Sequence, residues 1–104
     1  MSNSPKVRLS RLRDIGFHDW DPIGLLAEGE TWDHKGFADE YDSYLLEAAS
    51  LIRRGTPESE VVDRLVWVEV EHMGVGESGR ADALRRARNT VKAILADLEL
   101  WVVE

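Results

Sequence analysis

The stretch LRRARNTVKAILADLELW, residues 84–101, decides the fold that this sequence predicts. Its apolar residues recur three or four positions apart, and this spacing places their side chains along one face of an α-helix. The apolar positions are Leu84, Ala87, Val91, Ile94, Leu98 and Trp101. We therefore predict a long fourth helix of roughly six turns, with Ser78 as its N-cap, and we expect the other helices to pack against this face.

Two shorter helices are predicted in the first half of the chain. The first covers residues 7–15 and is expected to stop at Gly16, because glycine often follows the last turn of a helix. The second should begin with Asp39 as its N-cap, which places carboxylates at the positive end of the helix dipole, and should end before Gly55. Its apolar face comprises Tyr41, Tyr44, Leu45, Ala48 and Ile52.

The third predicted helix has the clearest start in the chain. Thr56 serves as its N-cap and Pro57 occupies the first helical position, and the helix should end at Gly74. Residues 65–70, LVWVEV, are rich in β-branched and aromatic side chains, so a strand competes with a helix there. We prefer a helix because capping residues enclose one uninterrupted segment and no second strand is available for pairing.

Length and composition fit one all-α domain of four helices over residues 1–104, with a disordered tail at residues 1–5. Apolar residues make up 43% of the chain, which is enough for a core, and the absence of cysteine excludes disulfides and thiolate metal sites. We find no secretion signal and no apolar run long enough to span a membrane. The expectation is a cytoplasmic protein without membrane association.

The segment between the first two helices is predicted to be an irregular loop organised by the motif Trp20-Asp21-Pro22-Ile23-Gly24. A residue before proline avoids the helical region, so Asp21 can cap the amide of Ile23 or Gly24. Pro22 then starts one short helical turn, Ile23–Ala27. Trp20 should fix the turn to the core, and Tyr41 at the end of the loop belongs to the same structural motif.

Charge is unevenly distributed along the chain, which has a net charge of -7. Residues 1–13 carry four basic residues and no acidic one, whereas residues 14–50 carry ten acidic residues against Lys35 alone. An acidic surface repels nucleic acids and attracts basic proteins, so we expect a basic protein partner, such as a toxin, and no nucleic-acid partner. The residues predicted to face this partner are Asp19, Glu28, Glu30, Trp32, Asp33, Asp39, Glu40 and Asp42. The alternative is that the acidic segment is only a solvated surface.

An enzymatic function is the second hypothesis. Glu69 and His72 have the spacing with which a helix presents two ligands to a metal ion, but such sites require a second pair, which this sequence lacks. His18 and His34 lie among aspartates in the loop, where they could bind a cation or act as acid and base. The serines lack the context of a nucleophile, and the glycine-rich residues 74–79 lack the lysine of a phosphate-binding loop. We therefore predict no catalytic residue, no metal ligand and no cofactor.

The third hypothesis is a structural subunit of a homo-oligomer. It is favoured if Trp67 and Trp101 are exposed together, because large apolar patches on soluble proteins mark contacts with other chains. A clean monomer in solution would remove it.

The motifs of the chain resemble a known family. WDPIG at residues 20–24, followed by DEYD at residues 39–42, a Gly55-Thr56 helix junction and a Met73-Gly74 ending, is similar to small bacterial all-helical domains of unknown function, the YugE-like group. The likeness spans residues 14–75 and implies a four-helix fold without established catalysis. Some similar small acidic bacterial proteins act as immunity proteins against toxins. The leading hypothesis is therefore a non-enzymatic binding protein, for example of immunity or antitoxin type, that presents its acidic residues to a basic partner.

Overall fold

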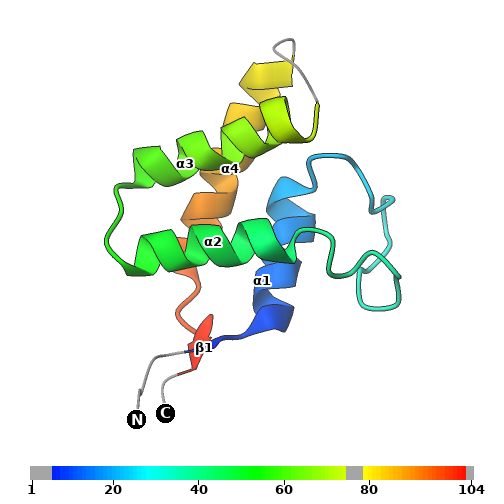
Figure 1. Ribbon diagram of the computed structural model, residues 1–104. Helices are drawn as coiled ribbons and strands as arrows, with labels where there is room; N and C mark the ends of the chain where they lie inside the picture. Colours follow the sequence, from blue (N-terminus) through cyan, green and yellow to red (C-terminus); the bar gives the residue numbers. More distant parts are fainter. Residues whose placement is uncertain (1–5, 75–78, 103–104) are drawn as a thin grey trace.

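The computed structural model describes residues 6–74 and 79–102 and has an all-α architecture with two very short strands (Figure 1). In chain order the elements are β1 (Lys6–Val7), α1 (Leu9–Ile15), the π-helical segment η1 (Gly16–Trp20), α2 (Asp42–Arg53), α3 (Glu58–Trp67), the π-helical segment η2 (Val68–His72), α4 (Arg80–Ala96) and β2 (Trp101–Val102). The predicted all-α class with four helices is confirmed. The disordered tail predicted for residues 1–5 and the cap predicted at Ser78 lie outside the described residues.

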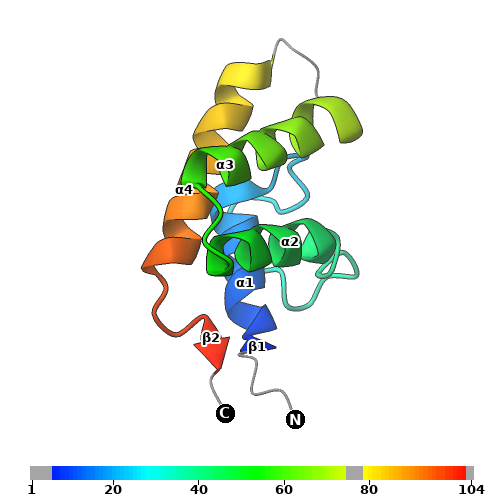
Figure 2. The same cartoon turned by 60° about the vertical axis from the view of Figure 1, so that its left-hand side comes forward.

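The core is built around the inner face of α4, which packs mainly on α3 and η1 (Figure 2). The buried residues of α4 are Ala83, Ala87, Thr90, Val91 and Ile94. The two alanines on this face leave room for the neighbouring helices to approach closely. Large side chains then fill the space between the elements, and the most deeply buried of them include Leu12, Trp20, Tyr41, Leu45, Leu65 and Leu100.

The fourth helix ends earlier than predicted. It stops at Ala96, and Asp97 takes an extended backbone (φ -84°, ψ 94°). The carboxylate of Asp97 accepts a hydrogen bond from the amide of Glu99 at 3.0 Å, a local bond that competes with helix continuation. The predicted seam is therefore wrong at its end, because Leu98 is 93% exposed. Trp101 instead belongs to β2, which pairs antiparallel with β1 and sets Trp101 opposite Val7.

The first helix does not stop at Gly16, as the sequence predicted, but continues as η1 with helical backbone angles at Gly16. A Cβ atom at Gly16 would collide with Cδ1 of Leu45 in α2. This glycine therefore permits the close approach of two helices, and the helix runs on to Trp20.

The start residues predicted for α2 and α3 also require correction. The N-cap of α2 is Tyr41 and not Asp39, because consecutive turns fill the end of the loop, including one in which the amide of Asp42 donates to the carbonyl of Asp39. The N-cap of α3 is Pro57, whose ψ of 140° is not helical, and Thr56 lies one residue outside. The observed N-cap lies two residues after the predicted one in α2 and one residue after it in α3.

The junction between α2 and α3 matches the sequence more closely. Gly55 has a φ of +87°, which favours glycine. Its amide donates to the carbonyl of Ile52 at 3.1 Å, while the amide of Thr56 donates to that of Leu51 at 3.0 Å, and these two bonds define a Schellman ending. Residues 65–70 are helical, as we preferred over a strand. None of the helices in the described part of the chain is both long and apolar enough to cross a membrane.

Candidate functional site

The loop between η1 and α2 is held in place by Asp21. Asp21 has left-handed backbone angles (φ 31°, ψ 59°), which bring its carboxylate back over the residues that follow. The carboxylate accepts hydrogen bonds from the amides of Leu25 at 2.8 Å and Leu26 at 3.1 Å, and from the Tyr41 hydroxyl at 2.7 Å. Asp21 is thus not the helix cap that the sequence predicted: its carboxylate binds loop amides further along than Ile23 and Gly24. The short helix predicted at residues 23–27 is absent, since the backbone there is irregular.

The other residues of the WDPIG motif support this arrangement. Trp20 is 1% exposed and packs against Tyr41 and Tyr44, with ring centroids 5.3 and 6.0 Å apart, as a core staple requires. Its indole Nε1 is buried and has no hydrogen-bond partner within the described residues. Pro22 is half-buried, and Gly24 has a φ of +62° in the turn that follows. Burial and the hydrogen bond to Asp21 raise the pKa of the Tyr41 hydroxyl, which stays protonated.

A pocket of about 640 Å³ lies between this loop and the α1–η1 helix. Its lining comprises the carboxylates of Asp14, Glu28, Glu30 and Asp33, the rings of Phe17, Trp32 and His18, and the residues Leu26, Ala27, Gly29 and Thr31. Within the described part of the chain, neither lysine nor arginine contributes to this lining. The pocket is therefore acidic and has an aromatic wall.

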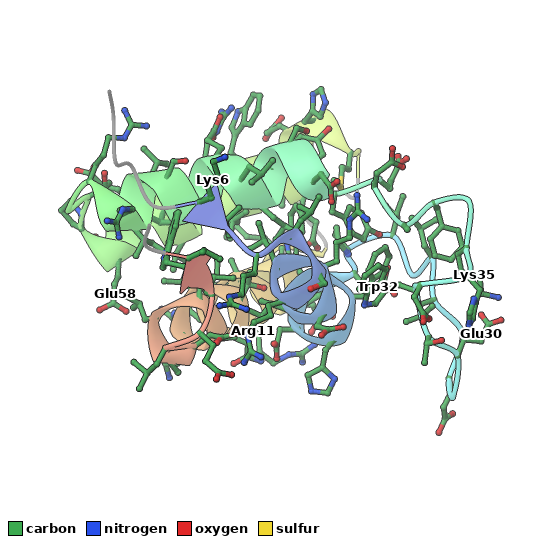
Figure 3. All side chains as sticks on the ribbon, turned by 90° about the horizontal axis from the view of Figure 1, so that it is seen from below. Lys6, Arg11, Glu30, Trp32, Lys35 and Glu58 are labelled. Carbon is green, nitrogen blue, oxygen red and sulfur yellow. The ribbon has the colours of Figure 1, made fainter. Side chains whose placement is uncertain are left out.

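The aromatic wall is fixed by several contacts to Trp32. The Trp32 ring stacks on Phe17 with centroids 6.5 Å apart, and its indole Nε1 donates a hydrogen bond to Asp14 Oδ1 at 2.6 Å. The guanidinium of Arg13 lies 5.6 Å from the ring centroid and is itself paired with Asp42 at 2.7 Å. Figure 3 shows Trp32 next to the first helix, whereas Glu30 and Lys35 lie at the outer end of the loop. These contacts join the wall to α1 and η1 and, through the pair of Arg13 with Asp42, to α2.

Two of the pocket carboxylates are held in their charged form by local bonds. The ammonium of Lys35 bonds to Glu30 and, together with the amide of Ala27 at 3.0 Å, lowers the pKa of the Glu30 carboxyl. A hydrogen bond from the side chain of Thr31 lowers the pKa of Asp33. Glu30 is therefore partly neutralised by Lys35, whereas Glu28 and Asp33 are exposed at the pocket. These last two are the carboxylates most available to a ligand.

Only some of the residues predicted to face a partner line the pocket. Glu28, Glu30, Trp32 and Asp33 line the pocket together. Asp39 and Glu40 are exposed near the start of α2, outside the pocket lining. Asp42 is occupied by Arg13, and Asp19 is only partly accessible, with burial raising the pKa of its carboxyl.

Sequence reasoning missed Asp14, Phe17 and Leu26 as members of the pocket, and it treated His18 only as a catalytic candidate. The signal was present in the spacing: Asp14 and His18 are four residues apart and share one face if the helix continues past residue 16. The prediction that the helix ended at Gly16 hid this relationship.

The groups required for metal or acid–base chemistry are separated. Glu69 is fully buried and accepts hydrogen bonds from the guanidinium of Arg86, one of them at 3.1 Å. His72 is exposed and packs on Trp67, with centroids 6.1 Å apart. His34 lies 3.7 Å from Asp33 on the loop surface. Nowhere in residues 6–74 and 79–102 do three potential metal ligands of the His, Cys, Asp and Glu types come together.

Trp67 and Trp101 do not form the single apolar patch that would favour a structural oligomer. Trp67 is 46% exposed at the end of α3, where the Arg64 guanidinium covers it at 4.8 Å. Trp101 is half-buried in β2, with Arg53 at the end of α2 stacked 5.0 Å from its ring centroid. A different arginine therefore covers each tryptophan, and the two tryptophans lie in different elements, at the end of α3 and in β2.

In comparisons with known proteins, no family model matches the chain, and neither the curated proteins nor the solved structures give a match. The resemblance to the YugE-like group stays a prediction.

Proposed function

We propose that this chain is a non-enzymatic protein-binding module whose acidic pocket receives a basic side chain of a protein partner. The observation that carries the proposal is the composition of the pocket: four carboxylate residues, an aromatic wall, and no lysine or arginine among its described lining residues. Opposite charge favours a cation there, and the predetermined position of Trp32 reduces the entropy lost on binding.

An arginine is the side chain that fits this chemistry best. Its planar guanidinium can stack on an indole and form paired hydrogen bonds with carboxylates. Within the molecule, the Arg13 guanidinium already lies 5.6 Å from the centroid of the Trp32 ring, so this ring is compatible with a guanidinium neighbour. The exposed carboxylates of Glu28 and Asp33 are the groups that would bind the incoming cation.

The proposed partner is a basic protein. We propose that binding this partner serves an immunity or antitoxin function in a bacterium. Its support is the net charge of -7 and the concentration of acidic residues in residues 14–50. Charged groups at the rim of such a contact mainly raise the association rate, while aromatic and arginine anchors supply most of the affinity. Binding should therefore weaken as salt is added.

The test is titration of the purified chain against the product of the adjacent gene, at low and at high salt. The double substitution Glu28→Gln/Asp33→Asn should weaken binding by roughly tenfold, or about 1.4 kcal/mol. The matched control is Asp63→Asn/Glu71→Gln, which removes two exposed carboxylates outside the pocket and should leave the affinity nearly unchanged. Equal affinities of the two variants, or no complex at low salt, would overturn the proposal.

A further inference from the structure

The outer face of α4 carries a basic stripe, formed by Arg85, Arg88 and Lys92. All three side chains are exposed, on the side of the helix opposite the buried alanines and valine of the core. Residues 83–96 include no acidic residue. This face is therefore a continuous positive surface on a protein whose net charge is -7.

The basic stripe is poorly neutralised by the rest of the molecule. Arg85 has only a surface contact with Asp82, at 3.4 Å. Arg88 and Lys92 form no ion pair or hydrogen bond among the described residues. By contrast, the cations of α1 are paired: Arg11 with Asp97 and Arg13 with Asp42.

Local helix energetics do not account for these cations. The helix dipole favours basic residues in the last turn, and the last turn of α4 contains none. A solvated helix face usually mixes both signs of charge. The stripe beyond Asp82, by contrast, carries positive charge alone. Apart from the surface contact between Arg85 and Asp82, the stripe has no partner of opposite charge among the described residues.

We infer that the basic stripe docks on the acidic loop of a second copy of this chain. The two surfaces are complementary in charge: Arg88 and Lys92 on the helix, Glu28 and Asp33 on the loop. Each also has an exposed apolar side chain, Leu95 at 45% on α4 and Ile23 at 47% on the loop, that can be covered by the contact. Among the described residues, no ion pair joins the stripe to the acidic loop within one molecule. Both surfaces are therefore free to pair between two molecules.

This contact would be heterologous, because two different surfaces meet. One copy uses its basic stripe and the other its acidic loop, so each copy keeps its other surface free. Copies therefore assemble head to tail, and the assembly grows with protein concentration. It covers the same pocket that the proposed function assigns to a basic partner, so the two interactions compete. The inference itself does not depend on that function, because self-association is measured with no partner present.

The test is sedimentation velocity of the full chain over a range of concentrations and salt. The expected result is an average mass above that of the monomer at low salt, which falls to the monomer value at high salt. Salt has the opposite effect on nonspecific association, because screening reduces the repulsion between molecules of charge -7. A wild-type chain that is monomeric at low salt at every concentration would overturn the inference.

Charge exchange makes the test specific. The variants Arg88→Glu/Lys92→Glu and Glu28→Lys/Asp33→Lys should each be monomeric alone, whereas an equimolar mixture of the two should associate, because each restores the surface that the other needs. The control Lys6→Glu/Arg54→Glu makes the same change in charge at exposed positions elsewhere and should still associate. A mixture that stays monomeric, or a control that dissociates as fully as the stripe variant, would contradict the inference. Circular dichroism of each variant confirms that it is folded.

Discussion

The carboxylate of Asp21 and the hydroxyl of Tyr41 are joined by a hydrogen bond of 2.7 Å, which closes the loop of the candidate site. The same carboxylate accepts from the amides of Leu25 and Leu26, so one side chain fixes both ends of the loop. The shape of the pocket follows from this bond, because the loop carries most of the pocket's lining residues.

Replacing Asp21 by alanine should lower the free energy of unfolding by about 2 kcal/mol, because it removes the acceptor of two loop amides and leaves a buried hydroxyl without its acceptor. Tyr41→Phe should cost less, about 1 kcal/mol, since it removes a single hydrogen bond. Urea denaturation of both variants measures the difference. If Asp21→Ala were no more costly than Tyr41→Phe, the bonds to the two amides would contribute nothing.

Gly16→Ala should destabilise the protein by roughly 1 to 3 kcal/mol, because the new methyl group meets Cδ1 of Leu45 in a packed core. Gly36→Ala is the matched control: it has open space around it and no positive φ, so the same change should be nearly neutral. Thermal unfolding of the two variants compares them directly. Similar melting temperatures would show that η1 and α2 are not in close contact at this glycine.

Arg86→Ala should be the most destabilising of these substitutions, by about 3 to 5 kcal/mol, because it leaves the fully buried Glu69 without a counter-charge. The double variant Glu69→Leu/Arg86→Met should recover most of this loss, since it removes both charges together. Glu47→Gln breaks the exposed pair with Arg64 and should change stability by no more than about 1 kcal/mol. Equilibrium denaturation in urea checks all three, and a mild effect of Arg86→Ala would mean that water reaches Glu69.

The stability of the end of α4 should depend on pH through Asp97. The hydrogen bond from Arg11, above all, lowers the pKa of the Asp97 carboxyl in the folded protein. Its contribution to stability is therefore present above the unfolded-state pKa of about 3.9 and is lost as the pH falls through the lower folded-state value. Asp97→Asn should reduce stability at neutral pH and should make the loss of stability at acidic pH smaller, as measured by urea midpoints across the acidic range. If the variant lost as much stability at acidic pH as the wild type, this loss would come from other carboxylates.

The sequence determined by itself the helical class, the approximate extent of α2 and α3, and the turn at Gly55. These features depend on interactions between residues that are neighbours in the chain. The spacing of apolar side chains, the positive φ that glycine permits, and the bonds of the last helical turn all act within a few residues. Trp20 could also be placed in the core from the sequence, because a large apolar side chain gains free energy when it is buried.

Only the tertiary structure decided where two of the helices end and which residues meet in the pocket. α4 stops before Leu98 because Asp97 bonds to Arg11 on the first helix and the chain must turn for β2 to pair with β1. The first helix continues through Gly16 in contact with α2, and the missing side chain leaves room for Leu45, which is distant in the sequence. That continuation brings Asp14 and His18 to Trp32, and distant pairing also buries Glu69 against Arg86. Each of these outcomes rests on a contact between residues far apart in the chain, which local periodicity and capping patterns do not encode.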